Sequence, residues 1–189
     1  MIIKNREKRE KTFKQMLYFA LVSLTMSFAG LTSAYIISSG RKDWVTFNLP
    51  TIFYISTLVI ILSSISFYFA KKSMQKENKK RTSVLLFTSL VLGVLFVYCQ
   101  YSGYLDLTEA GLYFTGKDSN VASSLFDIVA FAHAVHVLIG LVVILVLLFN
   151  NYKEKYTAID YLGIKLGEIF WHFLGGLWVF LFLFFLAVL

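Results

Sequence analysis

The sequence predicts an all-α, polytopic membrane protein built as a bundle of five transmembrane helices. Three observations predict this class: hydrophobic residues make up 58% of the 189 residues, the mean hydropathy is +0.70, and the apolar residues fall into five long runs. A soluble domain has only roughly 45–50% apolar residues. Inside a bilayer the backbone must satisfy its own hydrogen bonds, and apolar runs without polar alternation favour helices over a barrel.

The five apolar runs define the expected helices within a single domain over residues 1–189. Each run is near or above the roughly 20 residues that cross a bilayer at 1.5 Å per residue. Pro50, the only proline, is expected in the first turn of the second helix, where its missing N–H has no helical partner to lose. The expected helices cover about 15–38, 49–70, 82–104, 123–149 and 166–189.

Basic residues lie between the apolar runs, and their distribution predicts the orientation of the helices. Most of them fall in residues 4–14, 71–81 and 150–165, whereas the segments around Arg41 and within 106–118 are poor in Lys and Arg. Because cytoplasmic loops are enriched in these residues, we expect the N-terminus in the cytoplasm and the C-terminus outside. The same placement favours contact with anionic lipid and argues against nucleic acid as a partner of this chain, despite its net charge of +7.

The ionisable residues inside the apolar runs are the candidate functional residues. His133 and His136 lie three apart on the fourth run, and Glu168 and His172 lie four apart on the fifth, so each pair shares one helix face. Ionisable groups are costly at membrane depth and mark functional positions. A short loop makes the two helices antiparallel neighbours, so the two pairs could approach each other in the cytoplasmic half.

Three interpretations of these residues stay open from residue chemistry alone. The first is a buried polar network, in which Glu168 bonds His172 while His133 and His136 bond to hydroxyls or backbone carbonyls. The second is a role with protons or lipid headgroups, and the third is a metal site. The paired Glu-x-x-His segments of helical di-metal sites are absent, and the first three runs supply no further histidine or acidic ligand.

Five short motifs, one on each run, resemble the helices of subunit III of the haem-copper oxidases. His133-Ala-Val-His136-Val-Leu-Ile-Gly140 resembles the HGLHVxxG motif of that family. Trp171-His172-Phe173, with Glu168 before it and Trp178 after it, resembles the E…WHFxDxxW segment. The three weaker similarities are Phe28-Ala-Gly-Leu-Thr-Ser-Ala-Tyr35 to FFAGLFxAY, Leu62-Ser63-Ser64 to LxSS, and Leu92-Gly93 with Phe96 and Gln100 to LG…F…Q.

The resemblance implies a non-catalytic subunit of a respiratory cytochrome c oxidase. Such a chain packs against oxidase subunits I and II, holds structural phospholipid and helps to maintain proton uptake, while the haem and copper belong to its partners. It implies no catalytic residue here: His133, His136, Glu168 and His172 are the polar cluster, and Gly140, Trp171, Phe173 and Trp178 are packing residues. The expected location is the bacterial inner membrane, with membership of a larger respiratory supercomplex left open.

Departures from the family pattern keep alternatives open. The acidic residues that the family places on three helices are replaced here by Leu24, Gly103 and Gly175. Subunit III of a quinol oxidase and the accessory subunit of nitric oxide reductase therefore stay as alternatives. Two different classes are an independent metal- or haem-binding membrane oxidoreductase and a small transporter, although inverted repeats and broken helices, which would mark a transporter, are not seen.

Overall fold

The computed structural model describes residues 2–42, 44, 46–112 and 120–189, with side chains from residue 6 onward. Within these residues the chain forms five helices and no strand. Each helix is long and apolar enough to cross a membrane, which confirms the predicted five-helix membrane fold. The helices are α1 (Ile2–Ser38), α2 (Ile52–Gln75), α3 (Lys79–Glu109), α4 (Val121–Tyr152) and α5 (Leu162–Val188).

The helices extend beyond the apolar runs that predicted them, mainly at their polar ends. α1 begins at Ile2 and not near residue 15, and α2 continues past residue 70 to Gln75. Hydropathy marks only the part of a helix that lipid covers, whereas Lys, Glu and Arg are themselves good helix formers. Residues 113–118 of the predicted 106–118 loop region lie outside the described residues.

Pro50 lies just before α2 and not in its first turn. The helix begins at Ile52, with Thr51 as its N-cap, and the carbonyl oxygen of Pro50 accepts a hydrogen bond from the Phe53 N–H at 3.1 Å. A proline carbonyl is unaffected by the ring that removes the N–H, so the residue still supports the first turn from outside. The predicted start of this helix near residue 49 was therefore too early.

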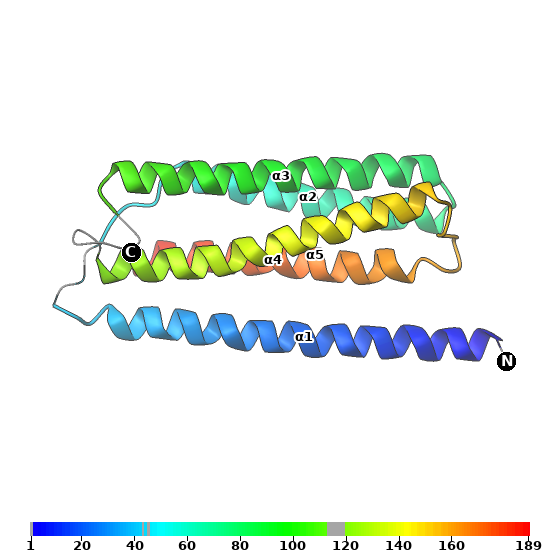
Figure 1. Cartoon of the computed structure of the whole chain (residues 1–189), viewed down its shortest axis with the longest axis horizontal. Coiled ribbons are helices and arrows are strands. Elements are labelled where there is room, and N and C mark those ends of the chain that lie inside the picture. The colour runs from blue at the N-terminus through cyan, green and yellow to red at the C-terminus, as the bar shows by residue number, and fades with distance from the viewer. Residues whose placement is uncertain (1, 43, 45, 113–119) are drawn as a thin grey trace.

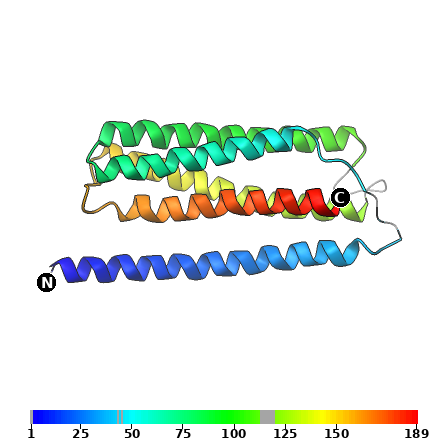
Figure 2. The same ribbon diagram turned by 180° about the vertical axis from the view of Figure 1, so that it is seen from behind.

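The helix α5 lies at the centre of the assembly. It contacts α1, α2 and α4, while α3 packs on α2 and α4 (Figure 1). Seen from behind, α5 runs between α1 and α2 (Figure 2). Among the described residues α1 contacts only α4 and α5, so one flank of α5 is left open between α1 and α2.

The three basic segments of the sequence lie at one end of the bundle, which we call the basic end. The N-terminus, the α2–α3 turn and the α4–α5 loop are all at this end, and the C-terminus is at the other (Figure 1). Ion pairs join the segments: Lys79 Nζ lies 3.5 Å from a Glu154 carboxylate oxygen, and an Arg9 nitrogen lies 3.8 Å from Asp160.

The first turns of α1 extend past the membrane and are held by one carboxylate. At 1.5 Å per residue the 37 residues of α1 span about 55 Å, against a hydrocarbon core of about 30 Å. Glu10 accepts hydrogen bonds from Lys165 Nζ at 2.9 and 3.1 Å and lies 2.8 Å from Lys14 Nζ. This carboxylate ties the polar part of α1 to the start of α5.

The substitution Glu10→Gln should loosen the N-terminal part of α1, because the neutral amide loses both ammonium partners. A partly exposed ion pair contributes about 0.2–1 kcal/mol, so the expected change is local and not global. Amide hydrogen exchange should speed up in the segment before residue 14, with little change in the thermal midpoint. Glu7→Gln, at an exposed position of the same helix, is the matched control. Equal exchange in the two variants would contradict the assignment.

Candidate functional site

The motif residues of four helices meet at the indole ring of Trp171, which is buried in the middle of the bundle. The ring occupies a slot left by two glycines. A Cβ atom at Gly93 on α3 would lie 2.8 Å from Trp171 Cη2, and one at Gly140 on α4 would lie 2.9 Å from Cζ3. Both distances are shorter than carbon contacts allow, so each glycine is required by the ring and not by its own backbone.

A hydrogen-bond chain fixes the polar edge of the same ring. Trp171 Nε1 donates to Ser63 Oγ on α2 at 3.1 Å, and Ser63 Oγ donates to the carbonyl of Ser89 on α3 at 2.9 Å. Ser89 Oγ donates back to the Ser63 carbonyl at 3.3 Å. Hydroxyl groups that bond across helices are a common means of association in lipid. α5, α2 and α3 are therefore tied at one level.

His133 lies in a cage of aromatic side chains that is further from the basic end than Trp171. Its side chain is 1% exposed, and neither ring nitrogen has a hydrogen-bond partner among the described residues. Its ring centroid is 5.4 Å from that of Trp178 at 80°, 6.2 Å from Phe96 and 6.3 Å from Phe28. The cage offers His133 no counter-charge.

His136 is half-buried and has a hydrogen-bond partner on its own helix. Its Nδ1 lies 2.6 Å from the carbonyl oxygen of Ala132, one turn earlier on α4. A carbonyl oxygen only accepts hydrogen bonds, so Nδ1 carries the proton in this arrangement. The ring also meets Phe28 edge-on at 6.0 Å. Both histidines of α4 thus pack against the same aromatic residue of α1.

Glu168 takes part in an ion pair that the sequence did not predict. Its side chain is 6% exposed, and Oε2 accepts a hydrogen bond from Lys71 Nζ on α2 at 2.7 Å. His172 Nε2 lies 3.8 Å from Oε1 on the same helix. Lys71 was counted with the polar segment 71–81, yet α2 continues through it. In the sequence, Lys71 directly follows the second apolar run. That position could have indicated that its side chain lies near the polar residues at the start of the fifth run.

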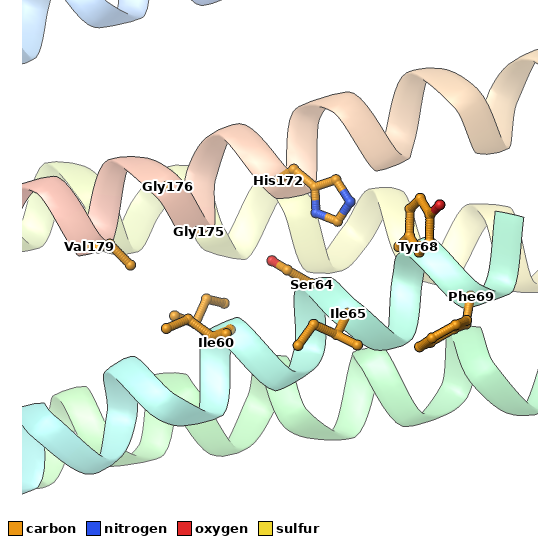
Figure 3. Close-up of a pocket in the computed structure, with 10 residues that line it drawn as sticks. Ile60, Ser64, Ile65, Tyr68, Phe69, His172, Gly175, Gly176 and Val179 are labelled. Carbon is orange, nitrogen blue, oxygen red and sulfur yellow. The ribbon is translucent and has the colours of Figure 1, made fainter. Parts of the chain in front are cut away.

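The structure brings Glu168 and His172 together but keeps them apart from the histidines of α4. Trp178, which touches His133, follows Glu168 by ten residues on α5, about 15 Å along the helix axis. His172 instead points into a cavity of about 430 Å³ between α5 and α2, beside Ser64 and Tyr68 (Figure 3). No hydrogen bond or ion pair joins the two pairs among the described residues.

Two of the remaining motif residues, Trp178 and Gln100, donate hydrogen bonds to α2, and a third lines a cavity. Trp178 Nε1 donates to Thr57 Oγ1 on α2 at 3.0 Å, and Phe173 lines a cavity of about 580 Å³ between α1 and α5. Gln100 on α3 donates to Ser56 Oγ on α2 at 3.0 Å. These contacts tie α5 and α3 to α2 through side-chain hydrogen bonds.

The three positions where family acidic residues are missing have different surroundings. A Cβ at Gly103 would lie 2.7 Å from the Phe53 ring and 2.8 Å from Ile52, so no carboxylate fits there without movement. A Cβ at Gly175 would lie 3.0 Å from Ser64 Oγ. Leu24 is partly buried against the core. Neighbouring side chains occupy the space at Gly103, whereas Gly175 lines the 430 Å³ cavity between α2 and α5.

The fold and the site define a class: a membrane-embedded helical subunit whose inner polar side chains mostly pair helix with helix. In the described ranges no group of three or more His, Cys, Asp or Glu residues is placed to hold a metal ion. A family model described as cytochrome c oxidase subunit III matches residues 10–187. The chain therefore belongs to the cytochrome c oxidase subunit III family, which confirms the resemblance drawn from the five motifs.

Relatives named cytochrome c oxidase subunit 3 come from distant organisms. The protein of Thermostichus vulcanus is 28% identical over 170 residues, which cover 86% of this chain and 80% of the relative. That of Drosophila melanogaster is 28% identical over 139 residues, 74% of this chain and 51% of the relative. That of Damaliscus lunatus is 30% identical over 128 residues, 68% and 47%. The chain spans about half the length of these two animal relatives.

Gly140→Ala should destabilise the protein, because the added methyl group would lie within 3.0 Å of Trp171 and Leu174. Overpacking of a core costs about 1–3 kcal/mol, which exceeds the helix propensity of up to about 1 kcal/mol that alanine gains over glycine. Gly30→Ala is the control, since a Cβ there meets nothing within 4 Å. Thermal unfolding in detergent should show a lower midpoint for the first variant only. Equal thermal midpoints of the two variants would contradict the conclusion that Trp171 requires a glycine at position 140.

The Lys71–Glu168 pair should respond unequally to loss of its two members. Lys71→Gln leaves a carboxylate that is 6% exposed, whereas Glu168→Gln leaves an ammonium that is 29% exposed and can reach water. We expect Lys71→Gln to cost about 1–3 kcal/mol and Glu168→Gln less, with the double variant more stable than Lys71→Gln alone. Thermal midpoints of the four proteins test this order. Additive effects of the two substitutions would show that the groups are not coupled.

Proposed function

We propose that this chain is the non-catalytic subunit III of a haem-copper terminal oxidase and that it braces the catalytic subunit. The observation that carries the proposal is the Trp171 slot, where motif residues of α2, α3, α4 and α5 pack closely together and are joined by hydrogen bonds. Such a core suits a chain that supports neighbours and does no chemistry of its own. The described residues supply helix-to-helix contacts and no metal-ligand group.

The partners follow from the family and the location from the charge pattern. We infer that oxidase subunits I and II are the neighbours, that haem and copper reside in them, and that phospholipid is held at the surface of the bundle. The basic end, with the N-terminus, is proposed to face the cytoplasm of a bacterial inner membrane. The names of the relatives favour cytochrome c over quinol as the electron donor of the complex.

Purification of the tagged chain from native membranes in mild detergent tests the proposal. A haem spectrum in the eluate, together with a catalytic subunit identified by mass spectrometry, is the expected result. The chain expressed alone should be colourless. A coloured isolated chain would favour the independent oxidoreductase class, and an eluate without any oxidase would overturn the bracing role.

His172→Ala should shorten the working life of the oxidase without changing its haem content. The substitution removes a neighbour of the Glu168 carboxylate, and since the His172 side chain is 37% exposed the loss is about 1 kcal/mol or less, under tenfold in lifetime. Turnover against time and haem absorbance per catalytic subunit are the two measurements. Phe131→Ala, an exposed position on α4, is the control. Loss of haem absorbance would contradict the proposed role.

A further inference from the structure

The cavity of about 430 Å³ between α2 and α5 has a mostly apolar wall into which a few polar side chains point. Ser64 and Tyr68 reach into it from α2, and His172 reaches in from α5 (Figure 3). Ile61 and Ile65 of its α2 wall are 40 and 47% exposed, so the cavity opens on the surface that faces lipid. A ligand that enters it must therefore dissolve in lipid.

Ser64 is the one serine of α2 whose hydroxyl group donates no hydrogen bond within the described part of the chain. The other serine and threonine hydroxyl groups of α2 donate to carbonyl oxygens at 2.8–3.3 Å; they belong to Ser56, Thr57, Ser63, Ser66 and Ser73. An unpaired hydroxyl group is unfavourable in an apolar environment. Ser64 therefore needs an acceptor that the described residues do not supply.

Gly175 provides the space into which Ser64 points. A Cβ atom at position 175 would lie 3.0 Å from Ser64 Oγ and 3.6 Å from Ile60 Cγ1. The family pattern has an acidic residue at this position, and its carboxylate would fill the space and could accept a hydrogen bond. A Cβ atom at Gly176 would meet nothing within 4 Å, so the floor of the cavity is bare backbone. The cavity is thus a feature of this sequence and not of the family pattern.

His172 supplies a second donor on the opposite wall. Its Nε2 lies 3.8 Å from the Glu168 carboxylate, which is too far for a hydrogen bond, and its side chain is 37% exposed. A neutral imidazole carries one N–H and one acceptor nitrogen. Because His172 lies three residues before Gly175, the two share one face of α5. The Ser64 hydroxyl and the His172 N–H can therefore donate to the same ligand.

The depth and the charge of the cavity argue against a phospholipid headgroup as its polar occupant. Ser64 lies seven residues before Lys71, the first charged residue of α2, and so about 10 Å further into the membrane. The charge of Lys71 is already matched by Glu168 at 2.7 Å. An acyl chain alone would leave Ser64 and His172 without an acceptor. One water molecule takes up about 30 Å³, a small part of the cavity.

We propose that this cavity binds the neutral ring of a membrane-soluble quinone, whose carbonyl oxygens accept hydrogen bonds from Ser64 and His172 above the bare backbone of Gly175 and Gly176. A flat ring with carbonyl acceptors and a hydrocarbon tail matches an apolar cavity that has few donors and opens to lipid. Ligand pockets of roughly 300–1,000 Å³ have this character. The proposal concerns binding alone, includes no electron transfer and is independent of the bracing role.

Native mass spectrometry of the purified full chain, titrated with decyl-benzoquinone or with decylbenzene, tests the site. The two ligands share a ring and a tail and differ in the carbonyl oxygens. Each hydrogen bond should contribute about two- to tenfold in affinity, so the quinone should bind about four- to 100-fold more tightly. Equal affinities would show partition into an apolar groove only and would overturn the proposal.

Three variants locate the binding. Ser64→Ala should weaken quinone binding about two- to tenfold and leave decylbenzene unaffected. Ser23→Ala, at an exposed position of α1 outside the cavity, is the matched control and should change neither affinity. Gly175→Asp, which restores the acidic residue of the family pattern, should weaken binding of both ligands because it fills the space. If Gly175→Asp fails to fold, Ser64→Ala decides by itself, and equal losses for its two ligands would contradict the proposal.

Two further measurements separate a hydrogen-bonded quinone from a lipid chain in the same groove. The infrared carbonyl band of the bound quinone should lie at lower frequency than that of the free quinone, and Ser64→Ala should reduce this shift. Phosphatidylglycerol should displace the quinone only at concentrations far above that of the quinone. An unshifted carbonyl band, or displacement at equal concentration, would overturn the proposal and leave the bracing role untouched.

Discussion

The structure depends on the fit of one indole ring between two helices that have no side chain at the point of contact. Trp171 needs Gly93 on one side and Gly140 on the other, and its N–H needs the Ser63 hydroxyl. Apolar burial gives little preference for one helix arrangement over another in lipid, because lipid tails are as apolar as leucine. Close packing and interhelical hydrogen bonds must therefore select the arrangement, and at Trp171 both act on one side chain.

Helix α1 is held by separate side-chain contacts along its length and not by the close packing around Trp171. Within the described part of the chain it contacts α4 and α5 alone among the helices, and these contacts are spread along its length. Glu10 pairs with Lys165 at the basic end, Phe28 meets both α4 histidines in the middle, and Tyr35 packs edge-on against Trp44 and Phe185 near the other end. Three separated contacts fix the tilt of a helix even where its two flanks stay exposed, so α1 can present surface to neighbours without losing its place.

The sequence predicted the number and type of the helices well, because a run of apolar residues long enough to cross a bilayer has few other solutions. It predicted helix ends poorly, since polar helix formers extended α1 and α2 beyond the lipid. One of its open interpretations paired Glu168 with His172, but none included Lys71, which donates a hydrogen bond to Glu168 at 2.7 Å. Helical spacing shows which residues share a face of one helix. The axial offset between two helices, which separates His133 from Glu168, is set by packing that no single sequence displays.

The environment of His133 explains why this buried histidine suits packing better than ligand binding. Both of its nitrogens lack a conventional partner, and a metal or a proton would leave a charge among Phe28, Phe96 and Trp178 with nothing to balance it. A neutral imidazole has a weaker need, because its N–H can point at an aromatic face, a contact that the near-perpendicular arrangement with Trp178 favours. His133 then acts as one more ring of the core. The buried ion pair of the bundle lies elsewhere, toward the basic end, where Lys71 and Glu168 neutralise each other and the Lys71 side chain is 29% exposed.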